Sequence, residues 1–189
     1  TYTMTLAGTG NFTGTVTHSF VIAPATDSEL ETDQNGNVVI GRGTIRVQVQ
    51  RESGAPEVVL QTSKAAVIEM LIQSGSLTAE ELVQVADGAD IAIILRAADI
   101  SDSISTEPKS RIGETAKGYT IGQYFGVSMY KQITIDGQTG EPTPVTDAAG
   151  SIKISLEVPE KLRNTDSTLT RTFRIVGCQE ETAEFLSEA

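Results

Sequence analysis

The segment YFGVSMYKQITI at residues 124–135 decides the fold class, because apolar and polar side chains alternate along it. Alternation with a period of two is typical of a strand with one buried face and one wet face. The segments at residues 151–158 and 169–176 repeat the pattern. The apolar residues that share one face of the first strand are Phe125, Val127, Met129, Ile133 and Ile135. Three such strands in one half of the chain predict a protein built mainly of β-sheet.

The composition excludes several classes of function. The chain has 189 residues, enough for one domain or for one domain and a fragment, and its net charge of −11 repels nucleic acid and anionic membranes. Cys178 and His18 are the only cysteine and the only histidine, so an internal disulfide, a cysteine zinc site and a His-based triad all lack parts. No apolar run approaches the length of a membrane span. We therefore expect no cofactor, no metal, no nucleic-acid partner and no membrane insertion.

Three stretches of different character divide the chain. Residues 1–24 alternate around the turn Gly8–Asn11 and predict a hairpin, which must lean on something because two strands alone are marginal in water. Residues 25–36 are acidic and polar and predict a linker, and residues 37–189 predict the main module. The chain opens inside an expected strand, which indicates a piece of a longer protein.

Several strands are expected in the main module besides those already described. The segments 44–50 and 57–61 flank a Ser-Gly-Ala-Pro turn and predict a hairpin. Residues 89–98 form the most apolar run, which predicts a central strand covered on both faces. Pro144 places its segment at a sheet edge or in a loop, and residues 182–186 predict one more edge strand.

Helical periodicity and cap residues predict two or three short helices. The first covers residues 64–72, with Ser63 as its N-cap. The second begins after Thr78, which forms a capping box with Glu81 and is flanked by leucines at the two staple positions. Proline near its start and Lys-Gly at its end predict a third helix near residues 108–116.

The N-terminal hairpin resembles part of a known repeat family. The residues Gly8–Val16, followed by Ser19–Ile22, are similar to the closing two strands of the "mostly bacterial" immunoglobulin-like repeats. That family ends with a Gly-x-Gly-Asn-aromatic-x-Gly turn and a Thr-rich strand that closes in Phe-x-Ile. The resemblance covers residues 1–24 and implies a surface protein in which such repeats are strung together.

A second resemblance covers about residues 40–176. Its motifs are Ile121–Lys131, Ile152–Pro159, Leu162–Asp166 and Thr170–Ile175. They are similar to an uncharacterised β-rich module near the C-terminal end of large surface proteins of Gram-positive bacteria. The family usually continues with two further strands, and it carries no agreed activity, so the resemblance implies no catalytic residues.

Together these patterns predict a mainly β, sandwich-like module with two or three short helices, preceded by an Ig-like hairpin remnant. The alternative is a single α+β domain that absorbs residues 1–24 as an edge pair. The expected function is non-enzymatic: a stalk, display or adhesion module of an extracellular bacterial cell-surface protein, with other proteins or cell-wall components as partners. The oligomeric state is left open. A carbohydrate-binding accessory module and an enzyme of unfamiliar type are the alternatives.

No residue is predicted to act in catalysis or to bind a cofactor or metal. Glycoside hydrolysis needs two carboxylates at a fixed separation, but most acids here fall in turns and linkers, and Glu157 alternates outward. Sugar-binding sandwiches stack ligands on aromatic faces, for which Tyr124 and Tyr130 are the candidates on one strand face. Residues 33–37 fit a calcium loop only in part, and an Asn-Gly turn is expected instead.

The remaining single candidates have simpler interpretations. His18 is expected to pack on its strand, and Cys178 is expected to act as a small hydrophobic residue. The sequon at residues 11–13 matters only in a eukaryotic secretory host.

Lys131 is the one charged residue in phase with the apolar face of residues 124–135. An unpaired ammonium there is costly. A β-bulge near Tyr130 would turn it to solvent, or the side chain would reach water along its stem. A third explanation is an isopeptide bond to an asparagine, as in some immunoglobulin-like domains of Gram-positive surface proteins. Asn164 is the only asparagine after Lys131 and falls in an expected loop, so we predict no isopeptide bond.

Overall fold

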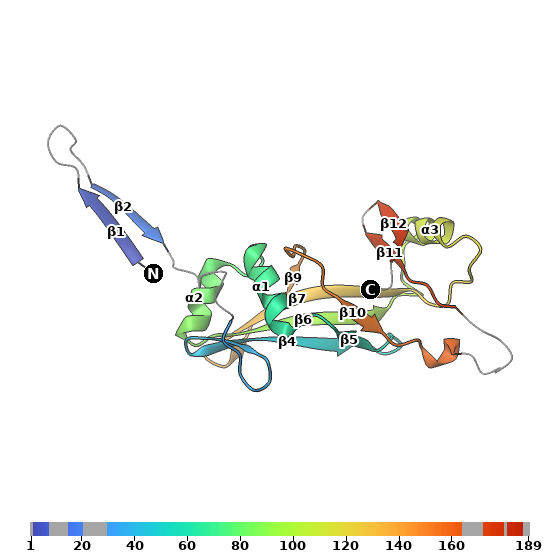
Figure 1. Cartoon of the computed structure of the whole chain (residues 1–189), viewed down its shortest axis with the longest axis horizontal. Helices are drawn as coiled ribbons and strands as arrows, with labels where there is room; N and C mark the ends of the chain where they lie inside the picture. Colours follow the sequence, from blue (N-terminus) through green and yellow to red (C-terminus); the bar gives the residue numbers. More distant parts are fainter. Residues whose placement is uncertain (1, 8–14, 21–29, 164–171, 180, 187–189) are drawn as a thin grey trace. The chain divides into compact units, whose positions relative to one another are not determined.

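The computed structural model describes residues 2–7, 15–20, 30–163, 172–179 and 181–186 (Figure 1). Within these ranges the chain forms three α-helices, a mixed six-stranded sheet and three two-stranded sheets. The predicted β-sheet and the two or three short helices are confirmed, but the arrangement is α/β and not mainly β as the sequence analysis expected. The helices are α1 (Lys64–Gln73), α2 (Ala79–Asp87) and α3 (Thr106–Thr115), with one 3₁₀ turn, η1 (Glu160–Leu162).

The six-stranded sheet has the order β3-β4-β6-β7-β8, and β9 also pairs with β7. Its strands are β3 (Val38–Ile40), β4 (Gly43–Arg51), β6 (Asp90–Asp99), β7 (Phe125–Ile135), β8 (Gln138–Thr139) and β9 (Thr143–Val145). The β3–β4, β7–β8 and β7–β9 pairs are antiparallel. β4 and β6 run in the same direction, because the N–H of Thr44 bonds the Asp90 carboxylate at one end and the N–H of Glu52 donates to Ala97 at the other.

The two-stranded sheets are antiparallel. They are β1 (Tyr2–Ala7) with β2 (Thr15–Phe20), β5 (Val58–Leu60) with β10 (Ile154–Leu156), and β11 (Val176–Gln179) with β12 (Thr182–Phe185). The β1–β2 pairing confirms the expected N-terminal hairpin. Its turn residues and the first part of the expected linker, up to residue 29, lie outside the described residues.

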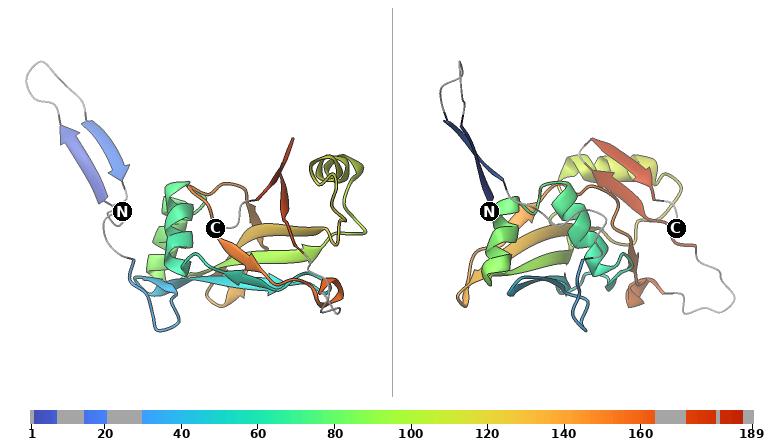
Figure 2. Two further views of the ribbon diagram at one scale, coloured as in Figure 1. Left: turned by 45° about the vertical axis from the view of Figure 1, so that its right-hand side comes forward. Right: turned by 60° about the vertical axis from the view of Figure 1, so that its left-hand side comes forward.

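The chain divides into two compact units, each made of three segments. Unit 1 comprises residues 1–48, 62–94 and 129–153, and unit 2 comprises the rest. Most of the buried apolar side chains belong to unit 1, where they come from β3, β4, β6 and the two helices α1 and α2. Figure 2 shows α1 and α2 side by side over the sheet.

The cap residues place the helices as the sequence predicts. The Ser63 hydroxyl accepts a hydrogen bond from Ala66 N–H, so Ser63 is the N-cap of α1. The reciprocal capping box of Thr78 and Glu81 begins α2, and both staple leucines, Leu77 and Leu82, are buried. Helix α3 begins at Thr106, two residues before Pro108, which the sequence analysis placed at the start of the helix.

The predicted hairpin of residues 44–50 with 57–61 is wrong. β4 lies between β3 and β6, whereas β5 pairs with β10, setting Val58 opposite Leu156. Ile45 and Val47 of β4 are buried, so this strand is stabilised in the interior of the sheet next to the most apolar strand, β6. The Ser-Gly-Ala-Pro turn would allow the two segments to pair with each other. Instead β4 pairs with β3 and β6, and β5 pairs with β10.

The predicted buried face of residues 124–135 is wrong in part. No residue of β7 falls in the buried class, and Val127 and Ile135 are 39% and 46% exposed. The strand at 151–158 shrinks to β10, and the strand expected at 169–176 begins only at Val176, while residues 169–171 lie outside the described part. Alternation creates a face that is able to be buried, but burial needs a second layer over it.

The residues before β3 form the expected Asn-Gly turn. The Asp33 carboxylate accepts hydrogen bonds from the backbone N–H groups of Asn35 (2.8 Å) and Asn37 (2.9 Å) and from the Asn37 amide (2.8 Å), and Gly36 has a positive φ of 72°. These hydrogen bonds, chiefly those from Asn37, lower the pKa of Asp33 below its usual value of 3.8.

The turn between β3 and β4 packs closely on the C-terminal end of α2. The Arg42 side chain donates to Asp87 O at 2.7 Å, and its N–H donates to Ala86 O. A Cβ atom at Gly43 would lie 2.0 Å from Ala89 O and 2.4 Å from Val85 O. Only glycine permits this approach of two backbones.

We expect Gly43→Ala to lower the free energy of unfolding by at least about 2 kcal/mol, because the new methyl group meets backbone atoms that cannot move aside. Chemical denaturation measures this loss of unfolding free energy, with one m-value shared by the wild type and the variant. Gly113→Ala in α3 is the matched control, since nothing lies within 4 Å of its added Cβ. The control should gain roughly 0.5–1 kcal/mol from helix propensity. Equal effects of the two substitutions would contradict the packing described here.

We also expect Asp33 to stabilise the fold only when it is ionised. A carboxyl with a lowered folded-state pKa contributes stability above its unfolded pKa and loses that contribution as the pH falls through the folded value. The difference in unfolding free energy between the wild type and Asp33→Asn should therefore shrink as the pH falls below about 5. Asp136→Asn, at an exposed turn, controls for the loss of one charge. A difference that stays constant down to pH 2 would contradict the role of the carboxylate.

Candidate functional site

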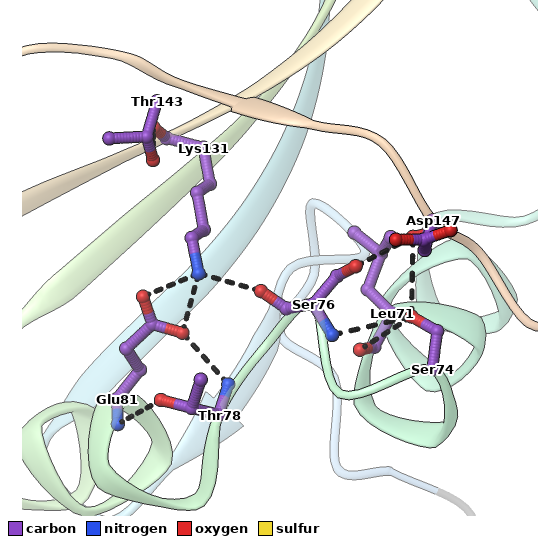
Figure 3. A network of polar contacts seen from close by, with 8 residues as sticks. All are labelled: Leu71, Ser74, Ser76, Thr78, Glu81, Lys131, Thr143 and Asp147. Atoms are coloured by element: carbon purple, nitrogen blue, oxygen red, sulfur yellow. Dashed lines mark hydrogen bonds and ion pairs between the residues drawn. The ribbon is translucent and has the colours of Figure 1, made fainter.

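The N-terminal end of α2 carries the most connected polar network of unit 1 (Figure 3). Glu81 occupies the third helical position, where its Oε2 atom accepts the N–H of Thr78 at 2.8 Å. In return the Thr78 hydroxyl accepts the N–H of Glu81 at 3.2 Å. The capping box thus holds the carboxylate in one orientation and aims it at the sheet.

Lys131 of β7 completes the network. Its ammonium group lies 2.6 Å from Glu81 Oε1 and donates to Oε2 at 2.8 Å and to the carbonyl of Ser76 at 2.7 Å. The side chains of Lys131 and Glu81 are only 17% and 15% exposed. An ion pair therefore satisfies the lysine, an explanation that the sequence analysis did not include.

The turn between α1 and α2 is held by a second set of bonds. The hydroxyls of Ser74 (3.2 Å) and Ser76 (2.6 Å) both donate to the carbonyl of Asp147. The N–H of Leu77 donates to Leu71 O at 2.9 Å. Together with Lys131, these contacts fasten the turn to β7 and to the segment after β9, as Figure 3 shows.

The charged groups of the network are bonded to atoms of the chain itself. An ammonium group has three N–H donors, and three acceptor atoms, two from Glu81 and one from Ser76, surround that of Lys131. Both carboxylate oxygens of Glu81 are engaged as well. A general acid, base or nucleophile needs an atom that a substrate can reach, and here the reactive atoms are occupied by the chain itself.

Unit 2 contains a comparable anchor at the end of β6. The Gln123 amide donates to Gly54 O and to Asp99 Oδ2, both at 2.7 Å, while its Oε1 atom is buried without a hydrogen-bond partner among the described residues. Hydrogen bonds from the side chain and N–H of Ser101 hold the pKa of Asp99 below its usual value, and Lys161, 4.0 Å away, adds to this.

A shallow hollow of about 350 Å³ in unit 2 gathers charges of both signs. Its arginines bond the chain itself: Arg51 donates to Ala55 O at 2.8 Å, and Arg163 donates to Val158 O and pairs with Glu157. The hollow therefore presents both acidic and basic side chains, and its two arginines already donate hydrogen bonds within the chain.

The structure places the remaining sequence candidates apart. Tyr124 is half-buried, with the Lys109 ammonium 5.8 Å from its ring centroid, and Tyr130 is also half-buried. Cys178 is half-buried in β11, opposite Ala183. The side chain of His18, the sequon at 11–13 and Asn164 lie outside what is described, so the predicted absence of an isopeptide bond stays a prediction.

Two properties of the described residues bear on metal binding and membrane insertion. They contain no group of three or more His, Cys, Asp or Glu side chains able to hold a metal ion. None of the helices in the described ranges is long and apolar enough to cross a bilayer.

No family model, curated protein or solved structure matches the chain.

We expect Lys131→Met to destabilise the fold by about 2–3 kcal/mol, because it leaves the Glu81 carboxylate with one partner fewer in a poorly hydrated place. Glu81→Gln should cost a similar amount. The double variant should cost clearly less than the sum, with a coupling of about 1–2 kcal/mol. Urea denaturation of the four proteins measures this cycle.

Lys153→Met is the matched control, since Lys153 is exposed in the same unit. It should change stability by no more than about 0.5 kcal/mol. Strict additivity of the Lys131 and Glu81 substitutions would show that the ion pair does not stabilise the protein.

Proposed function

We propose that residues 37–189 act as a non-enzymatic structural module of an extracellular bacterial cell-surface protein, preceded by an Ig-like hairpin at residues 1–24 and a linker at 25–36. The two sequence resemblances support the setting. The chain's net charge of −11 suits a protein that stays soluble outside the cell without binding nucleic acid. Other proteins or cell-wall components are the partners that such a module displays or contacts.

One observation carries the proposal: the partly buried charged groups bond the chain's own backbone and turns. Lys131 holds the α1–α2 turn, Asp33 closes the turn before β3, and Asp99 anchors the loop after β6. Asp90 accepts both the N–H (2.9 Å) and the hydroxyl (2.7 Å) of Thr44. Charges used in this way stabilise a shape, which is what a spacer or display module needs.

The sandwich-like description of the module belongs to the same proposal. Its support is that β5 and β10 pair with each other and not with the six-stranded sheet. A second, smaller sheet is the element that a sandwich requires and that a single-layer α/β arrangement lacks.

The carbohydrate-binding alternative receives less support from the aromatic side chains. Tyr119 (52%), the most exposed tyrosine among the residues whose burial the structure describes, meets Phe185 at a ring-centroid distance of 5.6 Å and an interplanar angle of 59°. A sugar ring stacks on a flat, open aromatic face, and this tilted pair does not offer one.

If the module is structural, deleting residues 1–24 should leave a single cooperative unfolding transition, because the polar linker separates the hairpin from the core. Calorimetry of the two proteins tests this. On an array of bacterial and host glycans the full chain should show no saturable binding tighter than about 1 mM.

The control for the array is Tyr124→Ala, together with Tyr130→Ala. Saturable glycan binding that either variant abolishes would overturn the structural assignment in favour of the carbohydrate-binding module. Loss of the cooperative transition on deletion would instead show that residues 1–24 belong to the main fold.

A further inference from the structure

Asn35 and Gly36 form the one Asn-Gly pair of the chain, since the other asparagines, Asn11, Asn37 and Asn164, precede larger residues. An asparagine before glycine is especially prone to deamidation, because glycine has no side chain to hinder attack by its own nitrogen. Asn35 is exposed in the structure, so water reaches it. The sequence and the exposure together mark Asn35 as a candidate site of covalent modification.

Deamidation of this pair needs one particular approach of two atoms. The Gly36 nitrogen loses its proton and attacks Cγ of Asn35, the Cγ–Nδ2 bond breaks, and ammonia leaves with the proton. Water then opens the resulting five-membered succinimide at either of its carbonyl groups. Opening at Cγ gives aspartate, whereas opening at the backbone carbonyl gives isoaspartate, whose main chain is longer by one methylene group. Ring closure therefore requires a Gly36 nitrogen that is free of hydrogen bonds and lies against Cγ.

The native turn engages this nitrogen. The Gly36 N–H donates to the carbonyl of Asp33 at 3.0 Å, which closes a four-residue β-turn. Asn35, the third residue of the turn, does not have a positive φ, so the turn is of type I. In that type the ψ of the third residue is about 0°, which directs the next nitrogen away from the Cα–Cβ bond. A succinimide ring needs the nitrogen to eclipse that bond, so the turn and the ring exclude each other.

The Asp33 carboxylate holds the turn in this form. Its Oδ1 atom accepts the N–H groups of Asn35 at 2.8 Å and of Asn37 at 2.9 Å, and its Oδ2 atom accepts the Asn37 amide at 2.8 Å. The N–H of Asp33 donates to the carbonyl of Asn37 at 2.9 Å, and the Lys64 ammonium donates to the carbonyl of Asn35 at 3.1 Å. These hydrogen bonds resist the rotation of the Asn35 main chain that ring closure requires.

We propose that Asn35 is a deamidation site that the folded turn suppresses, so that it reacts only when the hydrogen bonds of Asp33 open. The aspartate product keeps the main chain of the turn. The isoaspartate product does not, because its additional methylene group displaces the Gly36 N–H from the Asp33 carbonyl. The turn leads directly into β3, where Val38 bridges Thr32 and is fully buried, so isoaspartate disturbs this edge of the six-stranded sheet.

Incubation of the full chain in heavy-oxygen water at mildly alkaline pH, followed by peptide mapping, measures the reaction rate at Asn35. The native protein should react at least about ten-fold more slowly than the same chain unfolded in guanidinium chloride, because reaction waits for local opening of the turn. Asp33→Ala, which removes the carboxylate acceptors, should accelerate the reaction of the native protein at least about three-fold. Far-UV circular dichroism verifies that each variant folds, and the comparison of native with unfolded wild type does not depend on any variant.

Glu31→Ala is the matched control, because Glu31 is an exposed acid beside the turn and its carbonyl, which the variant keeps, accepts the N–H of Val39 at 2.8 Å. This variant should react at the wild-type rate. Isoaspartate protein, separated by chromatography, should melt at a lower temperature than the wild type, whereas Asn35→Asp should melt like it. Equal rates in the native and unfolded chains would overturn the proposal. So would an unchanged rate in Asp33→Ala, equal acceleration by Asp33→Ala and Glu31→Ala, or an unfolded chain that does not react at Asn35.

Discussion

Both faces of β6 are apolar, and the rest of the described structure depends on keeping water away from them. Ile91, Ile93 and Leu95 alternate with Ala92 and Ile94, and all five are buried. Such a strand is stable only in the interior of a sheet, between β4 and β7, with further layers over it. Because β4 and β6 are parallel, a long crossover must join them, and that crossover supplies the covering helices α1 and α2.

The ion pair of Lys131 and Glu81 follows from this arrangement. Covering the sheet brings the turn between α1 and α2 toward β7, where a lysine interrupts an otherwise apolar set. Glu81 resolves the conflict because one carboxylate both completes the cap of α2 and neutralises the ammonium. A buried ion pair is weak evidence for stability in general, but this one ties α2 to β7 at the position where Glu81 both caps the helix and pairs with Lys131.

The two units differ in how they use their surface. Unit 1 buries most of the apolar core and directs its partly buried charges inward to the backbone. Unit 2 contains nine of the ten exposed large hydrophobic side chains among the described residues, and its described residues carry eight basic and ten acidic side chains.

Local features were readable from the chain because they depend on neighbours a few residues apart. The capping box of Thr78 and Glu81, the Ser63 cap, the turn at Asp33 and the apolar run of β6 all belong to this class. Strand partners were not readable: the segment 44–50 pairs with β3 and β6 rather than with 57–61, because competition among distant strands decides the pairing. The same holds for Lys131, whose partner lies fifty residues earlier in sequence. Sequence alone determined which residues need a partner or a cover, through periodicity and side-chain chemistry. Only the tertiary structure decided which distant residue supplies it, because that depends on how the crossover packs on the sheet.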